Sequence, residues 1–335
     1  MFDPDAKEAA LREESESWDT TAPLPALDGD VPVVDVGAYF ATGSNRDLQT
    51  AARDLQHAAE TVGFHQLLGH GIAPDDTEAV LSQARRFFDL PDATKSTIRM
   101  DRPEWPLAGS GYLPVGERKL PRRAKGNANE AFVIKCDREV GFDENQWLDE
   151  HDLPGFRNAI QNYARLITDL ALRLLPVYAA ALDLAPNFFE SAFRHAFSRL
   201  RLSHYPPAPQ RTTNDDPYGI APHVDTTFFT LLLQGGPGLT LYSHQREAWV
   251  SVPVVDGAFV VNSGELLRQW SNDRFLSTRH FAHNSSGSHR YSVPFFFNAT
   301  SDYPMECLPT CQGPGNPPKY PAISYQQSQG VVQGE

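Results

Sequence analysis

Three side chains in the second half of the chain are of the types that bind a divalent metal. His223 and Asp225 are two residues apart and directly precede the apolar run Thr226–Leu233. His280 begins a later apolar run. At the entrance to a strand, side chains at i and i+2 point to one side, so His223 and Asp225 are expected to face a barrel mouth together. Two imidazoles and one carboxylate leave the opposite coordination positions open, which non-haem iron(II) needs to bind O2 and a co-substrate.

Arg290 and Ser292 form a second polar group downstream of His280. They are two residues apart in a run that is typical of a strand, so alternation puts both on one face and turns Tyr291 to the other. A guanidinium and a hydroxyl directed into a pocket can hold a carboxylate. Phe296 shares their face, which makes it the candidate for lining the pocket.

The runs that carry these residues are short and are separated by Gly, Pro, Asn or Ser. Many short strands at such spacing indicate an antiparallel sandwich or barrel. The predicted strands of this half are Leu200–Tyr205, Thr226–Leu233, Leu239–Tyr242, Trp249–Val252, Ala258–Asn262, His280–His283 and Arg290–Asn298.

The first half of the chain is predicted to be rich in helices. Apolar residues recur at helical spacing in Leu48–Val62, Asp75–Phe88, Pro154–Leu184 and Pro186–Phe193. Pro176 is expected to kink or break the third helix. Strands at Val31–Val36 and Phe64–Leu68 are expected to extend the sheets of the barrel. Residues 101–128 are interpreted as a long irregular loop, either a lid over a site or a surface excursion.

Composition restricts the classes of function. The formal net charge of -13 argues against nucleic acid or an anionic membrane as the main partner. Three cysteines do not make a disulfide framework, and the apolar stretch Leu170–Ala185 is too short and too polar to span a bilayer. With no signal peptide visible, we expect a cytoplasmic protein, a monomer or weak homodimer, that acts on a small molecule.

Several motifs, taken with these residues, resemble those of a known family. They are G-F-H-Q-L-L-G-H-G-I at Gly63–Ile72, H-Y-P-P at His204–Pro207, H-V-D at His223–Asp225, L-L-L-Q at Leu231–Gln234, V-N-S-G-E-L-L at Val261–Leu267, S-N-D-R-F-L-S-T-R-H at Ser271–His280 and R-Y-S-V-P-F-F-F at Arg290–Phe297. Together they resemble the isopenicillin N synthase-like group of iron(II)/2-oxoglutarate oxygenases. The resemblance extends from about Val31 to Asn298.

This resemblance implies a fold, cofactors and roles for individual residues. The fold would be mainly β with flanking helices, a double-stranded β-helix (jelly-roll) barrel with a helix-rich N-terminal half. The activity would be that of a dioxygenase that uses Fe(II), 2-oxoglutarate and O2 to hydroxylate, desaturate or cyclise a small molecule in specialised metabolite biosynthesis. The implied metal ligands are His223, Asp225 and His280. The implied co-substrate ligands are Arg290, Ser292, Tyr205 and Ser203, the last standing where many members have Asn.

The implied segments follow from the resemblance and the predicted elements. They are a flexible acidic tail at 1–30, a helix-rich region at 31–198, the jelly-roll oxygenase core at 199–300 and a C-terminal extension at 301–335. Two other functions stay open at this point. One is an oxidase of the same fold that uses no 2-oxoglutarate, because the Arg290/Ser292 pair indicates carboxylate binding alone. The other is a non-catalytic jelly-roll protein that binds a small ligand.

Overall fold

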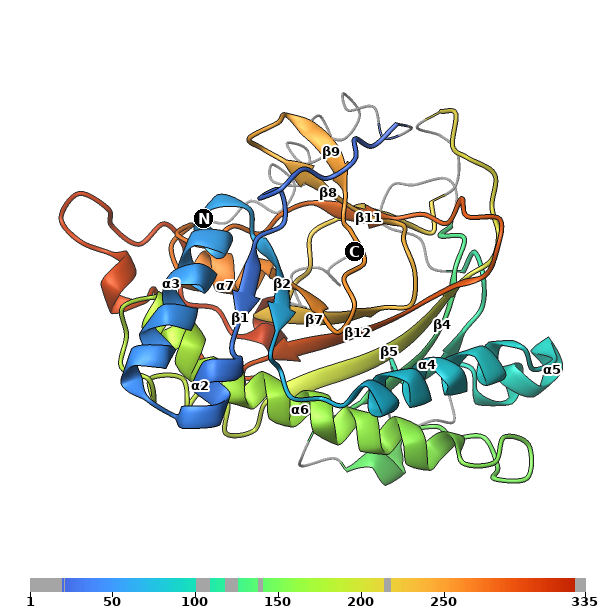
Figure 1. The fold of residues 1–335 in the computed structure, drawn as a ribbon. Coiled ribbons are helices and arrows are strands. Elements are labelled where there is room, and N and C mark those ends of the chain that lie inside the picture. Colours follow the sequence, from blue (N-terminus) through green and yellow to red (C-terminus); the bar gives the residue numbers. More distant parts are fainter. Residues whose placement is uncertain are drawn as a thin grey trace.

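The architecture consists of helices, a large sheet and a small sheet stacked in that order (Figure 1). The computed structural model describes residues 20, 22–100, 109–117, 126–137, 141–213 and 218–328. Within these residues the strands form two separate hydrogen-bonded sheets, and they do not close into one continuous barrel. The site-bearing residues lie between the sheets.

The large sheet has eight strands in the order β1-β2-β10-β7-β12-β5-β4-β3. Only β1 and β2 pair in parallel, and the other pairs are antiparallel. Two early strands therefore extend a sheet made mostly from the second half of the chain. Its strands are β1 Val33–Asp35, β2 Phe64–Leu68, β3 Gly111–Leu113, β4 Glu130–Lys135, β5 Phe197–Tyr205, β7 Phe229–Gln234, β10 Phe259–Ser263 and β12 Arg290–Asn298.

The small sheet has four antiparallel strands in the order β6-β11-β8-β9. Leu24 extends along the outer strand, because its backbone exchanges hydrogen bonds with Trp249 and Ser251. Apolar side chains from both sheets, among them Phe64, Leu241 and Val260, pack into one cluster between them. The strands are β6 Ile220–His223, β8 Leu239–Ser243, β9 Ala248–Ser251 and β11 His280–Ala282.

The helices cover the face of the large sheet that points away from the small sheet (Figure 1). The longest, α6, keeps one broad apolar face buried along its length. The α-helices are α2 Gly37–Thr42, α3 Asn45–Thr61, α4 Pro74–Phe88, α5 Asp92–Lys95, α6 Phe156–Ala181 and α7 Glu265–Trp270. Three short 3-10 helices are η1 Ser96–Ile98, η2 Phe142–Glu144 and η3 Pro309–Cys311.

Two predictions about helices differ from the structure: Pro176 does not break the third helix, and no helix forms at 186–193. Helix α6 continues through Pro176, because the residues beyond the proline remain packed on the sheet. There the ring of Tyr178 stacks on that of Phe229 at 4.8 Å, so tertiary contacts hold the last turns. Residues 186–193 form successive turns and no helix. Their aromatic spacing serves packing, since Phe189 and Phe193 contact a single ring, that of Phe228.

Three strands were missed, β3, β4 and also β6, which ends at His223. Strand β3 lies inside the segment 101–128 that was interpreted as an irregular loop. The structure describes only 109–117 and 126–128 of this segment, and outside β3 these residues belong to no helix or strand. Strand β4 pairs with β3 on one side and with β5 on the other, and thereby extends the large sheet beyond the predicted barrel. Within the described ranges, no helix combines the length and the apolar character needed to cross a bilayer.

Candidate metal centre and co-substrate pocket

The three predicted metal ligands lie together at the edge of the small sheet. His223 is the last residue of β6, Asp225 follows in the next loop, and His280 is the first residue of β11 and pairs directly with His223. Asp225 Oδ1 is 3.5 Å from His223 Nε2 and 3.8 Å from His280 Nε2. The prediction that the His-x-Asp motif opens the following strand was wrong, because β7 begins only at Phe229. A loop residue is nevertheless brought to the same point.

Hydrogen bonds orient each of these side chains. Nδ1 of His223 lies 2.8 Å from the carbonyl oxygen of Ala221, and Nδ1 of His280 lies 3.1 Å from that of Thr278. With Nδ1 donating to a carbonyl, each Nε2 keeps a lone pair that points to the centre. Sequence reasoning missed the partners that hold Asp225.

Thr230 and Asn262 position the carboxylate of Asp225. The hydroxyl of Thr230 and the amide of Asn262 donate to Oδ2 of Asp225 at 2.7 and 2.9 Å. Oδ1 therefore remains for a metal. Both residues were predicted to lie in strands, but which of their neighbours they would contact depends on the pairing of those strands. Both belong to strands of the large sheet, so the metal centre joins the two sheets.

The electrostatics of the centre favour a cation. Burial acts to raise the pKa of Asp225, but the combined effect of His280, His223 and the Asn262 amide is larger and lowers it. The carboxyl therefore stays ionised. Burial and the neighbouring His223 lower the pKa of His280 to about 4, so its ring is neutral near pH 7. The ionised Asp225 and the neutral His280 ring thus offer electron pairs at the point where His223 Nε2 also lies. Their ligand atoms all lie within 4.8 Å of one another, and no further His, Cys, Asp or Glu of the described residues joins the group.

Arg290 presents an unpaired cation to the space between the sheets. Its side chain is buried, its Nε donates to the carbonyl of Gly236 at 3.3 Å, and its Nη1 has no partner among the described residues. The guanidinium lies over the ring of Tyr205, 4.5 Å from its centroid. Because a buried unpaired charge is costly, this group is suited to an anionic ligand.

The other predicted co-substrate residues surround this guanidinium. Strand β12 pairs with β5 so that Arg290 faces Tyr205 and Ser292 faces Ser203. The hydroxyl of Ser292 donates to that of Tyr205 at 3.4 Å. Ser203 is fully buried, and its hydroxyl has no partner among the described residues. The four predicted residues are therefore neighbours on one face of the sheet.

A cavity of about 60 Å³ connects the two groups. It is lined by the metal-binding side chains, by Tyr205, Arg290 and Ser292, and by Phe296, as the alternation argument predicted. The ring of Phe64 meets that of His280 edge-on at 5.2 Å and forms part of the apolar wall. The arrangement can hold a metal at one point and a carboxylate at another.

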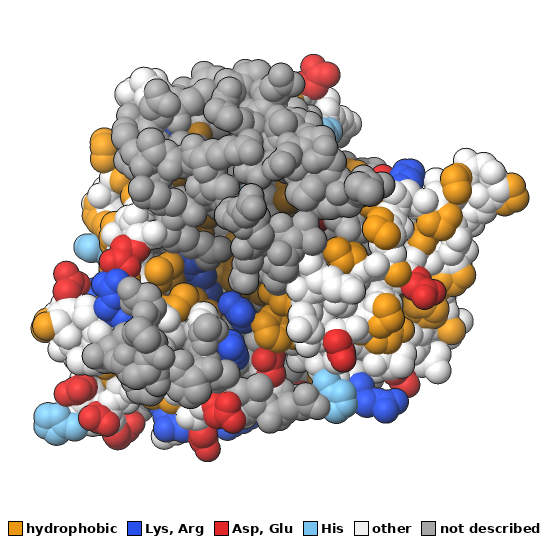
Figure 2. Space-filling view, turned by 180° about the vertical axis from the view of Figure 1, so that it is seen from behind, with side chains coloured by type: hydrophobic (Ala, Val, Ile, Leu, Met, Phe, Trp, Pro, Cys, Tyr) orange, Lys and Arg blue, Asp and Glu red, His pale blue; other side chains and the backbone are white. Residues whose placement is uncertain are grey.

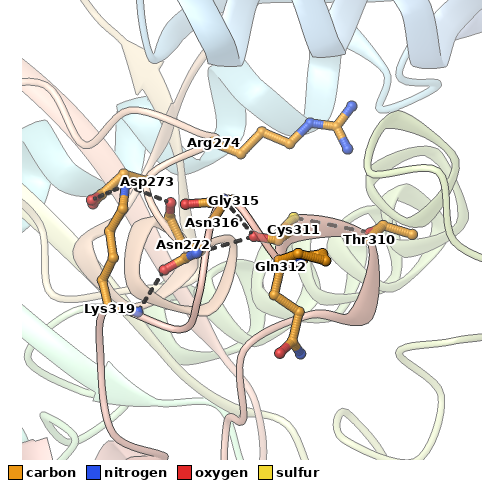
Figure 3. A pocket seen from close by; sticks show the side chains of 11 residues that line it. Asn272, Asp273, Arg274, Thr310, Cys311, Gln312, Gly315, Asn316 and Lys319 are labelled. Atoms are coloured by element: carbon orange, nitrogen blue, oxygen red, sulfur yellow. Dashed lines mark hydrogen bonds and ion pairs between the residues drawn. The ribbon is translucent and has the colours of Figure 1, made fainter.

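A larger cleft of about 610 Å³ lies elsewhere, between the C-terminal extension and the turn after α7 (Figure 3). Its polar groups bind one another. The amide of Asn272 donates to the carbonyls of Cys311 and Pro317, and its oxygen accepts from the backbone of Lys319. Lys319 also forms an ion pair with Asp273 at 3.0 Å. Since these groups satisfy one another, the cleft is a junction that anchors the extension.

Comparison with known proteins gives matches along most of the chain. The model of the 2OG-Fe(II) oxygenase superfamily matches residues 196–299, and that of the non-haem dioxygenase in morphine synthesis N-terminal family matches residues 31–150. A 2-oxoglutarate-Fe(II) type oxidoreductase (hxnY) of Emericella nidulans is 31% identical over 307 residues, which cover 88% of this chain and 86% of the relative. A kihadalactone A synthase of Citrus sinensis is 30% identical over 296 residues, which cover 84% and 86%.

Solved structures show the same fold. A full-length protein of Neurospora crassa, solved in complex with alpha-KG (2-oxoglutarate), superimposes with a TM-score of 0.79 at 25% identity, over 93% of this chain and 98% of that one. The same fungal protein has been solved with alpha-KG and thymine, again at a TM-score of 0.79 and 25% identity, over 92% and 97%. The predicted jelly-roll fold with flanking helices is thereby confirmed.

The chain belongs to the 2OG-Fe(II) oxygenase superfamily. It is an Fe(II)- and 2-oxoglutarate-dependent dioxygenase that oxidises a small molecule, which confirms the first of the three functions considered from the sequence.

Proposed function

We propose that His223, Asp225 and His280 bind the Fe(II) of this dioxygenase. The proposal is supported by the convergence of their ligand atoms within 4.8 Å and by the hydrogen bonds at Nδ1 of each histidine, which orient Nε2 toward the centre. Three protein ligands leave room for further ligands at the metal. When bound, Fe(II) supplies the redox chemistry that couples O2 and 2-oxoglutarate to oxidation of a substrate C–H bond.

Arg290, Ser292, Tyr205 and Ser203 are proposed to bind 2-oxoglutarate. The observation that carries this assignment is the buried Nη1 of Arg290, which has no partner among the described residues and can donate to a carboxylate. Ser292 and Tyr205 add hydroxyl groups beside it. Stacking on the Tyr205 ring fixes the plane of the guanidinium, so the co-substrate is held in one orientation relative to the metal ligands.

The residues around the metal centre orient the reacting groups and exclude water. Thr230 and Asn262 fix the Asp225 carboxylate, and the backbone carbonyls behind the histidines fix their tautomers. Phe64 and Phe296 close the wall of the cavity, which limits the access of solvent to the substrate.

The substrate is proposed to be a free small molecule of specialised metabolism. Support comes from relatives whose names give such products or ligands, among them the kihadalactone A synthase and the thymine complex of the Neurospora crassa protein. The net charge of -13 disfavours nucleic acid or an anionic membrane as a partner. Three free cysteines fit the reducing cytoplasm. We further propose that the enzyme works as a monomer or weak homodimer.

The test uses anaerobic protein with one equivalent of Fe(II) and excess 2-oxoglutarate. A weak visible metal-to-ligand charge-transfer band is expected when the co-substrate chelates the bound iron, and succinate is expected after O2 is admitted. The same measurements on Asp225→Ala and Arg290→Ala separate the two assignments. Asp225→Ala should lose iron, whereas Arg290→Ala should keep iron and need far more 2-oxoglutarate for the same band.

Three results would contradict these assignments. A band of normal intensity in Asp225→Ala would exclude that residue as a metal ligand. Unchanged 2-oxoglutarate affinity in Arg290→Ala would exclude the proposed clamp. Iron binding by the wild-type protein without band or succinate would point to an oxidase that uses no 2-oxoglutarate, and no iron binding would point to a non-catalytic binding protein.

A further inference from the structure

A row of paired residues crosses the inner face of the large sheet at the level of the metal centre. Asn262 pairs with Thr230, and Thr230 pairs with Phe296 on β12. Phe296 pairs with Arg199 on β5, and Arg199 pairs with Lys135 on β4. The row begins at the two side chains that hold the metal-binding carboxylate. Since neighbouring strands are about 4.8 Å apart, Arg199 lies two spacings, roughly 10 Å, from Thr230.

Arg199 and Lys135 both belong to the inner face. Their neighbours Leu200 and Ile134 are buried in the core under the helices, on the opposite face of the sheet. Because side chains alternate along a strand, the residues beside them point toward the space between the sheets. Figure 2 shows that on the side of the molecule opposite to the view of Figure 1, basic side chains gather beside apolar ones around a hollow.

These two cations form no ion pair in the described part of the chain, although the carboxylates of Asp137 and Glu144 lie near enough to act on Lys135. Neither the guanidinium of Arg199 nor the ammonium of Lys135 forms an ion pair or side-chain hydrogen bond there, and Nε of Arg199 is buried without a partner. The pKa of Lys135 is lowered by burial and then by Arg199, while Asp137 and Glu144 act to raise it. Like charges opposite each other on neighbouring strands destabilise a sheet. The pair therefore resembles Arg290, whose unpaired nitrogen also faces the inter-sheet space.

The two cationic groups lie in different directions from the metal centre, Arg290 along β12 and the other pair across the sheet. Arg290 and Phe296 are the ends of a stretch of β12 that spans about 20 Å at 3.3 Å per residue. Arg290 lies at the co-substrate end, while Arg199 and Lys135 lie beyond Phe296. Between the metal ligands and the distal cations, Phe296 and Pro294 line the cavity. Arg201 is buried on the same face of β5, between Arg199 and Ser203. A molecule that lay along Phe296 and Pro294 would have an apolar body.

We propose that Arg199 and Lys135 bind the anionic group of the substrate, and that the enzyme therefore oxidises a small organic acid. The apolar body of the acid lies along Phe296 and places a carbon several bonds from the carboxylate next to the metal centre. This inference rests on the proposed function, because it needs Arg290 to hold 2-oxoglutarate.

The test compares matched acids and amides on the Fe(II)·2-oxoglutarate holoenzyme without O2. The probes are 4-phenylbutanoate with 4-phenylbutanamide, and octanoate with octanamide. Binding is measured from the change in the charge-transfer band and from thermal stabilisation. We expect each acid to bind at least about tenfold more tightly than its amide, the value for one charge-assisted hydrogen bond. The double variant Arg199→Gln/Lys135→Gln should lose this preference and keep its 2-oxoglutarate affinity.

Two further variants serve as controls. Arg194→Gln removes an exposed positive charge five residues before Arg199 and should leave acid binding unchanged. Arg199→Lys keeps the charge and should keep the preference for acids, so the inference remains testable if the double variant folds poorly. Equal binding of acids and amides would overturn the inference, and so would an acid preference that persists in the double variant. The inference would also fail if neither acid bound at concentrations up to about 10 mM, because a single ion pair to a fragment-sized ligand should give tighter binding than that. In each case the charge-transfer band shows separately whether the protein binds Fe(II) and 2-oxoglutarate, so failure of this inference can be distinguished from failure of the proposed function.

Discussion

The two faces of the large sheet use buried polar residues in opposite ways. On the helix side, the carboxylate of Glu130 accepts from Lys95 at 2.9 Å, from Tyr112 at 2.5 Å and from His204 at 2.7 Å. His204 in turn bonds His289 at 2.7 Å. On the inner face, the hydroxyl of Ser203 in β5 and Nη1 of Arg290 in β12 have no partner in the described ranges.

This difference separates structural polar groups from groups that bind ligands. A buried network that satisfies all of its members stabilises the fold, whereas an unpaired buried cation costs free energy unless a ligand completes it. His204 and Tyr205 are adjacent at the end of β5. His289 and Arg290 are also adjacent, and Arg290 begins β12. One residue of each pair belongs to the closed network and the next to the open site. Variants on the two faces should therefore affect different properties.

The largest effect is expected for His280→Ala at the metal centre. Loss of one of three ligands should abolish iron-dependent turnover, a decrease of about a thousandfold or more, while the free energy of unfolding changes little. Succinate formation and iron content after gel filtration measure this effect. Ordinary turnover in the variant would show that the ring does not bind the metal. His70→Ala, a buried histidine outside the centre that bonds Gly257, is the matched control and should keep its iron.

On the helix side, Lys95→Met should reduce stability and leave the site intact. The substitution leaves the Glu130 carboxylate buried without its cation, which costs about 3–5 kcal/mol of unfolding free energy. Urea denaturation measures the loss, and the 2-oxoglutarate affinity of the folded fraction should stay within about twofold, as expected for a residue on the other face. The double variant Lys95→Met/Glu130→Gln should recover part of the stability. If Lys95→Met instead weakened 2-oxoglutarate binding tenfold, the separation of the two faces would be broken.

Arg290→Ala should show the converse behaviour. Truncation of a buried charge that holds a carboxylate costs about 2–3 kcal/mol, so the concentration of 2-oxoglutarate at half-saturation should rise about a hundredfold. Since Nη1 has no partner among the residues that the structure describes, the free energy of unfolding should be unchanged or rise. Arg85→Ala removes a cation near Tyr291 on the helix side and should leave the affinity unchanged. Equal effects of the two variants would contradict the assignment.

The smallest effect concerns His65, which is buried with Leu67 on the helix side of β2. Burial lowers the pKa of His65 from 6.5 to about 3. Between these pH values the unfolded chain binds a proton that the folded protein excludes, so the free energy of unfolding falls as the pH falls, by at most about 1.4 kcal/mol per pH unit. His65→Gln should flatten the pH dependence of urea denaturation, and the exposed His151→Gln should not. An identical slope in wild type and His65→Gln would rule out this contribution.

Local sequence patterns were sufficient for the strands around the site. Phe64–Leu68 and Arg290–Asn298 were predicted with the bounds that the structure shows, because each combines β-forming residues with clear turn residues at both ends. The alternation along β12 also placed Arg290, Ser292 and Phe296 on one face, which the cavity lining agrees with. These features depend on neighbours in sequence alone.

Features that depend on distant contacts were not predictable. Residues 130–135 become a strand because β3 and β5 flank them, and the row that links Thr230 to Lys135 exists only through the register of the strands between them. Helix α6 continues through Pro176 because the sheet packs against its last turns. The basic cluster at 118–125 and most of the acidic tail lie outside the described residues.

The most direct measurement is a crystal structure of the anaerobic complex with Fe(II) and 2-oxoglutarate. We expect iron about 2.1 Å from Nε2 of His223, Oδ1 of Asp225 and Nε2 of His280, a distance typical of such ligands. We also expect the distal carboxylate of 2-oxoglutarate about 2.8 Å from the Arg290 guanidinium, the length of a charge-assisted hydrogen bond. Iron bound at other side chains, or a carboxylate held away from Arg290, would contradict the account.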